Sequence, residues 1–240
     1  MTNSPLSIQN LSKSFGSSRV LGGLSFDVPE GSIFGFVGVN GAGKTTTMKI
    51  ILGLLPSDDG EVYVCGEKVF VGATKTNRHI GYVPDVPEFY NYMRPKTYLK
   101  LCGEIAGLDT ATIEKRTIEL MNVVGLSGID KKIGKFSRGM KQRLGIAQAL
   151  LHEPKLLICD EPTSALDPIG RKDVLDILKQ IKDKTTVFFS THILSDVERI
   201  CDRIAIIHNG RIALSSTLAE IQARRKSDTA IEDLFLEISS

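Results

Sequence analysis

Hydrophobic stretches of two kinds alternate along the chain. Residues 6–15 and 22–31 mix apolar and polar positions and are broken by Gly and Pro, which is typical of strands. Other short stretches are apolar almost throughout and also predict strands: 32–40, 155–162, 185–192 and 203–214. Strands without polar alternation are buried on both faces, as in a parallel sheet flanked by helices. The pattern therefore predicts an α/β fold built on such a sheet, with further strands at 61–69 and 79–84.

In the segments between these strands, apolar residues recur at helical spacing. Residues 44–55 place Met48, Ile51, Leu52 and Leu55 at helical intervals. From about residue 90 to 126 β-branched runs are scarce and helical patterns follow one another, which indicates a helical insertion. More helices are expected at 138–154, 169–182 and 193–201, and two short ones around a charged linker in 216–240. We expect the helix at 138–154 to end at Pro154, since proline disrupts a helix interior.

Composition narrows the possible partners and the compartment. The 240 residues carry 30 basic and 28 acidic side chains, so the net charge is only +2 and no nucleic-acid partner is expected. The four cysteines are scattered and form no CxxC pair, which favours reduced thiols in a cytosolic protein. The start of the chain does not resemble a signal peptide. The longest apolar run, near residues 50–55, is shorter than the roughly 18 residues of a membrane helix, so we expect no bilayer span.

The stretch GVNGAGKTT, residues 38–46, fits the phosphate-binding loop pattern G-x-x-x-x-G-K-[ST]. Glycines allow backbone angles that let successive N–H groups curl around an anion. Lys44 would supply a positive charge for the outer phosphates, and the Thr45 hydroxyl is a ligand type that suits Mg²⁺. A helix that starts near Lys44 would direct its free N–H groups at the same phosphates. The apolar strand before the loop and the helix after it match this interpretation.

A second motif, LLICDE at 156–161, ends an apolar strand with two acids. Ligands of open α/β sheets bind at the carboxyl ends of the strands, where these carboxylates are expected. We expect Asp160 to hold Mg²⁺ through water and Glu161 to orient or deprotonate an attacking water.

The segment FSRGMKQR, residues 136–143, completes a resemblance to a known family. It is similar to the signature Leu-Ser-Gly-Gly-Gln of ABC (ATP-binding cassette) ATP-binding subunits, and with the two motifs above it makes residues 6–215 resemble such a subunit. Ser137 and Gly139 match the signature, whereas Phe136, Arg138 and Met140 depart from its commonest form. Ser137 is also expected to cap the following helix.

The resemblance implies a P-loop NTPase (RecA-like) core with a mostly parallel sheet, an N-terminal antiparallel β subdomain and an inserted α-helical subdomain. Within one domain over 1–240, the core and β subdomain would take up 1–85 and 155–215, the helical subdomain 86–154 and a helical tail 216–240. The implied ATP-binding residues are Phe15, Gly38, Asn40, Gly41, Ala42, Gly43, Lys44, Thr45 and Thr46.

Single residues outside the loop take their implied roles from the same resemblance. Phe15 would stack on adenine, His192 would contact the γ-phosphate as a catalytic residue beside Glu161, and Asp167 would touch a second subunit. Each has a simpler alternative: a core phenylalanine, an unremarkable histidine after a strand, and a turn acid before Pro168. These alternatives remain open at the level of sequence.

Asp85, in GYVPD at 81–85, is a departure from the family pattern, which usually has Gln there. That Gln reaches Mg²⁺ and the attacking water from a loop that faces the membrane subunits. We hypothesise that Asp85 keeps the coupling role with an altered metal affinity, because an anion near Mg²⁺ can strengthen metal binding. An acid that points to solvent is the alternative.

The implied function is hydrolysis of ATP with Mg²⁺ by a pair of cassettes, expected to be a homodimer. Ser137 and Gly139 would serve the partner's ATP, and closure of the pair would drive transport by integral membrane permease subunits. The short single cassette and its C-terminal segment resemble bacterial exporters of drugs, antibiotics or lipids, working on the inner, cytoplasmic face of the membrane. The alternative is a soluble ABC ATPase acting in cofactor assembly or on ribosomes or nucleic acid. The cargo is not readable from this chain.

Overall fold

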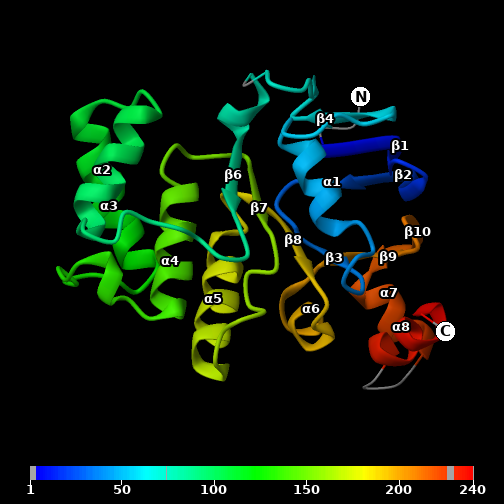
Figure 1. Ribbon diagram of the computed structural model, residues 1–240. Coiled ribbons are helices and arrows are strands. Elements are labelled where there is room, and N and C mark those ends of the chain that lie inside the picture. The colour runs from blue at the N-terminus through cyan, green and yellow to red at the C-terminus, as the bar shows by residue number, and fades with distance from the viewer. Residues whose placement is uncertain (1–3, 74, 226–229, 240) are drawn as a thin grey trace.

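A six-stranded sheet forms the centre of the computed structural model, which describes residues 4–73, 75–225 and 230–239 (Figure 1). Its order is β10-β9-β3-β8-β7-β6. The strands are β3 (Ile33–Val37), β6 (Ile80–Val83), β7 (Leu156–Cys159), β8 (Thr186–Thr191), β9 (Arg203–His208) and β10 (Arg211–Thr217). All neighbouring pairs are parallel except β10 with β9. The expectation of a mostly parallel sheet is confirmed.

A second, antiparallel sheet has the order β2-β1-β4-β5. It consists of β1 (Leu6–Phe15), β2 (Ser18–Val28), β4 (Asp59–Val64) and β5 (Glu67–Lys68). A backbone hydrogen bond joins this sheet to the central sheet: Gly22 N donates to Gly210 O at 2.7 Å. The N-terminal antiparallel region expected from the resemblance is therefore present.

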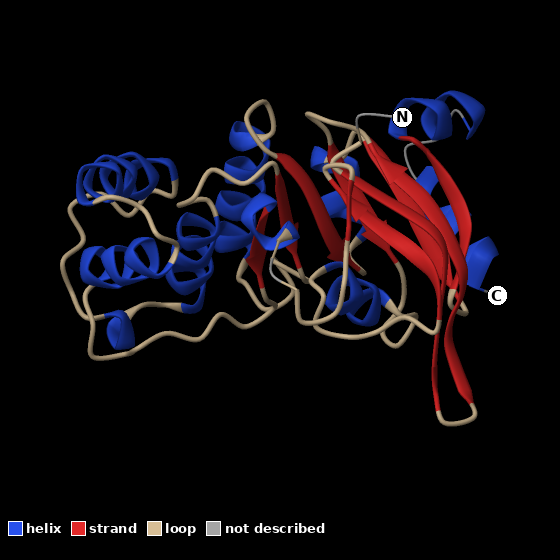
Figure 2. Cartoon of the chain, turned by 90° about the horizontal axis from the view of Figure 1, so that it is seen from above, coloured by secondary structure: helices blue, strands red, loops and turns tan. Residues whose placement is uncertain are grey.

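The helices fall into three groups (Figure 1). Helix α1 (Lys44–Ile51) follows β3 directly. Helices α2 (Pro95–Ile105), α3 (Thr110–Val123) and α4 (Arg138–Ala149) gather at one end of the molecule, away from the antiparallel sheet (Figure 2). The remaining helices are α5 (Pro168–Ile181), α6 (Leu194–Ile200), α7 (Leu218–Arg225) and α8 (Ala230–Ser239), with short 3₁₀ turns at Thr76–His79 and Ile133–Lys135. Most of the charged linker expected between the last two helices, residues 226–229, lies outside the described residues.

Strand β3 shows why the central strands are apolar throughout. Phe34 and Phe36 belong to a core shared with the antiparallel sheet and α1, and their rings pack with Phe188. Ile33 and Val37 belong to the other core, which α2 to α8 cover. All four β3 side chains are fully buried, because both faces of the strand are covered.

The structure corrects three expected boundaries. The stretch 61–69 is not one strand: the chain turns at Cys65 (φ 49°) and Gly66 (φ 78°), so β4 and β5 pair as antiparallel strands. The stretch 203–214 is not one strand: the chain reverses at Asn209 (φ 47°) and Gly210 (φ 71°), so β9 and β10 form a hairpin. Asn-Gly between apolar runs is a strong hairpin signal, because both turn positions need positive φ. The helix expected up to Pro154 ends at Ala149, and Glu153 adopts φ 56° before the proline. Within the residues that the structure describes, none of the helices is both long and apolar enough to cross a lipid bilayer.

Candidate active site

The glycine-rich loop 38–43 joins β3 to α1, and two of its glycines, Gly38 and Gly43, stand where a side chain would be crowded. A Cβ on Gly38 would lie 2.7 Å from both Cγ2 and O of Ile207. Gly43 has φ 110°, and a Cβ there would lie 2.5 Å from Cδ2 of Leu21. Another residue type at Gly38 would collide with the backbone of β9, and one at Gly43 would be strained by the positive φ and would displace the Leu21 side chain.

Helix α1 begins at Lys44 with free amides. Its first backbone hydrogen bond runs from Thr47 N to Gly43 O, at 2.9 Å, so the amides before Thr47 have no acceptor inside the helix. No side chain caps this end, and the first turn contains no acid. The positive end of the helix dipole is thus left for an external anion.

A hollow of ≈ 380 Å³ lies in front of this helix end. It is lined by Val20, Asn40, Gly41, Gly43, Lys44, Thr45, Thr46, Asp85, Asp160 and Glu161. The structure therefore brings together the glycine loop, the two acids after β7 and the acid after β6, as the sequence predicts. Gly38 lies at the start of the loop, and its carbonyl oxygen accepts a hydrogen bond from Lys44. Ala42, also in the loop, is 6% exposed.

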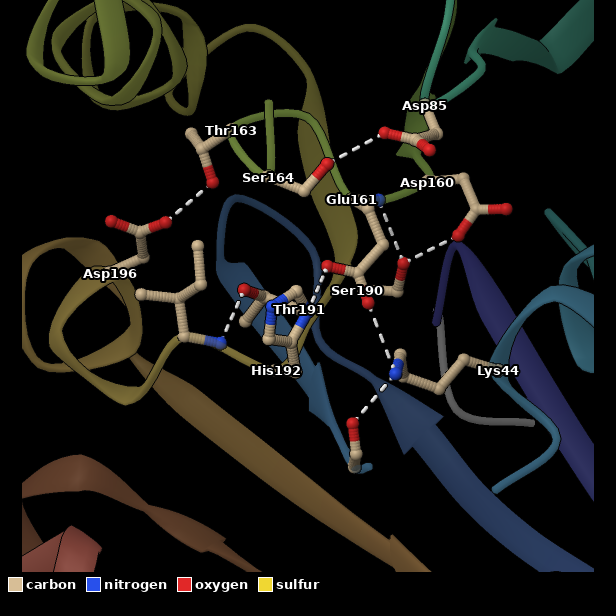
Figure 3. Close-up of polar contacts among 12 residues, drawn as sticks. Lys44, Asp85, Asp160, Glu161, Thr163, Ser164, Ser190, Thr191, His192 and Asp196 are labelled. Atoms are coloured by element: carbon tan, nitrogen blue, oxygen red, sulfur yellow. Dashed lines mark hydrogen bonds and ion pairs between the residues drawn. The ribbon is translucent and has the colours of Figure 1, made fainter. Parts of the chain in front are cut away.

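Lys44 points along the loop toward the acids (Figure 3). Its Nζ donates to Gly38 O at 2.6 Å and to Val39 O at 3.2 Å, and it lies 3.0 Å from Oε1 of Glu161. The side chain is only 6% exposed. The fixed ammonium is available as a point charge for phosphate oxygens.

Asp160 is held by two hydroxyl groups. Thr45 Oγ1 donates to its Oδ2 at 3.0 Å. Ser190 Oγ donates to its Oδ1 at 2.7 Å (Figure 3). Asp160 is 5% exposed. Adjacent carboxylate and hydroxyl oxygens are a donor set that suits Mg²⁺, which usually takes one or two protein ligands and completes its shell with water and phosphate. Among the described residues no group of three or more His, Cys, Asp or Glu gathers as a metal site.

Glu161 occupies the centre of the site in a strained backbone conformation, with φ 47°. Its N–H donates to Ser190 Oγ at 2.9 Å, which anchors it to β8. One carboxylate oxygen, Oε2, lies 2.8 Å from Nδ1 of His192. The other, Oε1, is buried and receives no well-aligned hydrogen bond within the described part of the chain, although Lys44 is close. A carboxylate fixed at this place can accept a proton from a water held beside it.

Asp85 enters the site from the end of β6. Its side chain is exposed, and its Oδ1 accepts a hydrogen bond from Ser164 Oγ at 2.7 Å (Figure 3). The same residue also lines a second hollow of ≈ 490 Å³, together with Val86, Phe89 and Phe136. Asp85 thus lies in the wall between two hollows.

His192 and four more predicted residues lie outside the lining of the ≈ 380 Å³ hollow. Phe15 is 50% exposed at the end of β1, with Lys13 Nζ 5.6 Å from its ring centre, so it is not a core phenylalanine. Ser137 caps α4 by accepting from Met140 N at 3.2 Å, as expected.

The other two lie close to each other. A Cβ on Gly139 would come within 3.7 Å of Gly170 Cα, so the first turns of α4 and α5 are in contact. Asp167 caps α5 by accepting from Gly170 N at 2.6 Å. The signature segment and Asp167 therefore share one surface of the chain.

Sequence reasoning missed three residues of the site. Val20 lines the hollow, Ser164 holds Asp85, and Ser190 bridges Asp160 and Glu161. A signal existed only for Ser190: a hydroxyl inside the apolar run TVFFST is buried and needs a hydrogen-bond partner.

Comparison with known proteins decides the family. The sequence profile described as ABC transporter matches residues 21–164, which include the glycine loop, both acids and the signature segment. The chain belongs to the ABC transporter family. It is the ATP-binding subunit, an ATPase whose activity in this family is coupled to transport.

Individual relatives agree with this assignment. The uncharacterized ABC transporter ATP-binding protein YxlF of Bacillus subtilis (strain 168) is 42% identical over 224 residues, 93% of this chain and 74% of that protein. The bacitracin transport ATP-binding protein BcrA of Bacillus licheniformis is 43% identical over 207 residues, 85% of this chain and 66% of that protein. A solved structure of an ATP binding subunit of an ABC transporter is similar with a TM-score of 0.85 and 33% identity, covering 97% of this chain and 98% of that one.

Proposed function

We propose that this ABC ATPase hydrolyses ATP with Glu161 as the catalytic base and that it drives export through separate membrane subunits. The observation that carries the chemistry is the position of Glu161: a largely buried carboxylate between Lys44 and His192. The core and β subdomain are assigned to 1–85 and 155–215, the helical subdomain to 86–154 and the tail to 216–240.

The residues around ATP have separate roles. The amides of the loop and of the first turn of α1 bind the phosphates, with Asn40, Gly41, Ala42 and Thr46 shaping the loop and Phe15 stacking on the base. Lys44 places its charge on the outer phosphates. Mg²⁺, bound by Thr45 and Asp160 with Asp85 as a further oxygen donor, would neutralise charge on the phosphate oxygens.

Glu161 and His192 act on the terminal phosphate. Glu161 orients a water and takes its proton, and its buried position keeps the carboxylate close to the water and away from bulk solvent. The imidazole of His192, now 2.8 Å from Glu161, then donates a hydrogen bond to the γ-phosphate.

Two such chains close head to tail around two ATP molecules. Ser137 and Gly139 lie outside the hollow of their own chain, at the exposed first turn of α4, so they are free to bind the partner's γ-phosphate. Asp167 shares that surface and contacts the second cassette. A homodimer is the simplest assembly.

The hollow of ≈ 490 Å³ is the proposed contact with the membrane subunits, on the inner face of the cell membrane. It is lined by segments from both the end of β6 and the start of the signature, and Asp85 connects it with the ATP site. Export of an antibiotic-like or lipid-like cargo is the direction supported by similarity to BcrA, whose name assigns it to bacitracin transport.

Affinity capture from native membranes, beside an ATPase assay of the Glu161→Gln variant, tests this function. We expect a polytopic membrane protein to co-purify with the wild-type chain, and its reconstitution to raise ATP turnover. Capture of ribosomal or cofactor-assembly proteins alone, from the fraction without membranes, would contradict the transport proposal. ATP turnover by Glu161→Gln at the normal rate would contradict the assignment of the base.

A further inference from the structure

A second contact joins the two segments that carry Glu161 and His192. Beyond Glu161 the chain passes Thr163, and beyond His192 it enters α6, which carries Asp196. Thr163 Oγ1 donates to Asp196 Oδ2 at 2.5 Å, and both residues are only 1% exposed (Figure 3). The two segments therefore meet at a buried side-chain pair as well as at the Glu161–His192 contact.

Arg171, which is 30% exposed, joins this group from a third element. Its Nε donates to Asp196 Oδ1 at 2.5 Å, and its Nη2 donates to Ser195 Oγ at 2.6 Å. Arg171 lies one turn into α5, and its backbone N–H donates a hydrogen bond to Asp167 O at 2.9 Å. Both oxygens of Asp196 are thus satisfied, as a buried carboxylate requires, and each oxygen contacts a different segment.

The two contacts between the segments differ in exposure. The His192 side chain is 42% exposed, so its imidazole can rotate away from Glu161 without opening the interior. Asp196 cannot leave Thr163 and Arg171 without stranding a buried charge. One contact is therefore free to exchange partners while the other keeps the segments at a fixed spacing.

Stability alone is a weak explanation for this group. A buried ion pair often contributes no more to stability than apolar side chains of the same volume would. Its members also come from the three segments that carry Glu161, Asp167 and His192. The group therefore lies where it controls the relative positions of the residues assigned to hydrolysis and to the dimer surface.

We propose that Asp196 is a positioning residue for hydrolysis. Its contact with Thr163 sets the spacing between Glu161 and His192. Its contact with Arg171 fixes the position of α5 relative to these two residues. This inference rests on the proposed roles of Glu161 and His192. Neither Thr163 nor Asp196 lines the ATP hollow, so a loss of the contact should change the rate of hydrolysis and leave ATP affinity unchanged.

The test compares three variants of the full chain. Thr163→Val removes the hydroxyl and keeps the shape, whereas Thr163→Ser keeps the hydroxyl. Thr185→Val is the matched control, because the Thr185 hydroxyl is also buried and bonded, to Pro154 O at 3.1 Å, but lies before the start of β8, at the end remote from His192. Each variant is measured for kcat, ATP dissociation constant and melting temperature.

We expect Thr163→Val to lower kcat about tenfold or more, because small misplacements of catalytic groups slow the chemical step strongly. The ATP dissociation constant should stay within about twofold of the wild-type value. Thr163→Ser should recover most of kcat, and Thr185→Val should leave it unchanged. Should Thr163→Val fail to fold, Arg171→Lys replaces it with the same expected pattern, since lysine keeps the charge but not the fork that reaches Ser195. Unchanged kcat in the folded variant would overturn the proposal.

Two readouts separate positioning from general destabilisation. The first is the NMR signal of the His192 ring, identified among the four histidines by its loss in His192→Ala. We expect Thr163→Val to shift this signal without ATP and Thr163→Ser and Thr185→Val to leave it in place. An unshifted signal in Thr163→Val would contradict positioning.

The second readout is the double variant Thr163→Val with His192→Ala. If Thr163 acts through the Glu161–His192 spacing, it should cost little further activity once the imidazole is gone. If the losses of kcat caused by Thr163→Val and by His192→Ala are fully additive, the inference is overturned. Glu161→Gln in the same assay isolates the underlying function: normal turnover there would contradict the proposed roles themselves, whatever Thr163→Val does.

Discussion

Oε1 of Glu161 and Nζ of Lys44 lie 3.0 Å apart, with side-chain exposures of 13% and 6%. The acid that follows β7 and the lysine of the glycine loop thus balance each other's charge within one chain. Because the same lysine is proposed to meet the outer phosphates, the Glu161 carboxylate and the phosphates compete for one ammonium group.

Glu161→Gln should therefore bind ATP as well as wild type or more tightly, because the competing anion is gone while the shape is kept. Hydrolysis should fall by at least about a hundredfold, the usual contribution of a general base. ATP binding measured by calorimetry and phosphate release measured in the same sample check both halves. Glu114→Gln, on the exposed face of α3, is the control and should change neither. Weaker ATP binding by Glu161→Gln would contradict the competition.

Gly43 and Gly41 offer a comparison of two glycines with positive φ. A Cβ on Gly41 (φ 84°) meets nothing within 4 Å, whereas one on Gly43 meets Leu21 Cδ2 at 2.5 Å. We expect Gly41→Ala to lower the free energy of unfolding by about 1–2 kcal/mol from backbone strain alone. Gly43→Ala should cost a further ~1–3 kcal/mol from overpacking. Urea unfolding of both variants tests this, and equal losses would show that the contact with Leu21 relaxes freely.

Motifs whose chemistry is local could be predicted from the sequence. The spacing of Gly38, Gly43 and Lys44 specifies a turn, a helix start and a charge within one short segment, and the structure has all three. The acids after β7 were equally predictable, because a buried parallel strand must end at the edge of the sheet where the other strands end.

Contacts between distant segments could not be predicted. Ser190 reaches Asp160 because β7 and β8 are neighbours with Cys159 opposite Phe189, and no periodicity within either strand encodes that order. The positive φ of Glu161 is likewise invisible in the sequence, since glutamate does not favour it. The hairpin at Asn209 has a local signal in its Asn-Gly turn, unlike these contacts. The apolar runs on both sides of the turn nevertheless favour a single strand when the pattern alone is considered.

Asp85 and Ser164 allow a test of how the site holds metal. Asp85→Asn removes a charge near the proposed Mg²⁺ ligands, and we expect the Mg²⁺ concentration for half-maximal ATP turnover to rise about fivefold, the equivalent of roughly 1 kcal/mol for a solvated charge pair. Ser164→Ala frees the carboxylate from its 2.7 Å hydrogen bond and should lower that concentration instead. Titration of turnover with Mg²⁺ distinguishes the two directions.

Variants of Asp85 also test coupling to the membrane subunits. Because Asp85 lies between the two hollows, Asp85→Asn and Asp85→Gln should also change the stimulation of turnover by reconstituted membrane subunits. If both variants keep wild-type Mg²⁺ dependence and wild-type stimulation, Asp85 has neither role, and its contact with Ser164 is structural only.

Ser137 has two separable tasks, capping α4 and, as proposed, binding the partner's γ-phosphate. Ser137→Ala loses the cap to Met140 N and should lower the free energy of unfolding by about 1 kcal/mol. Ser137→Asp keeps a good cap, so its stability should stay near that of wild type, but its carboxylate would face the partner's phosphates. Both variants should bind ATP normally as single chains, because Ser137 lies outside the hollow of its own chain.

Sedimentation with ATP, in the Glu161→Gln background, measures the second task of Ser137. We expect a dimer when Ser137 is retained and a monomer for Ser137→Asp, because the added negative charge repels the phosphates of the partner's ATP. Ser137→Ala should weaken the dimer less, since it removes a hydrogen bond without adding a charge. A dimer that forms equally well in Ser137→Asp would place the serine away from the nucleotide and leave capping of α4 as its whole role.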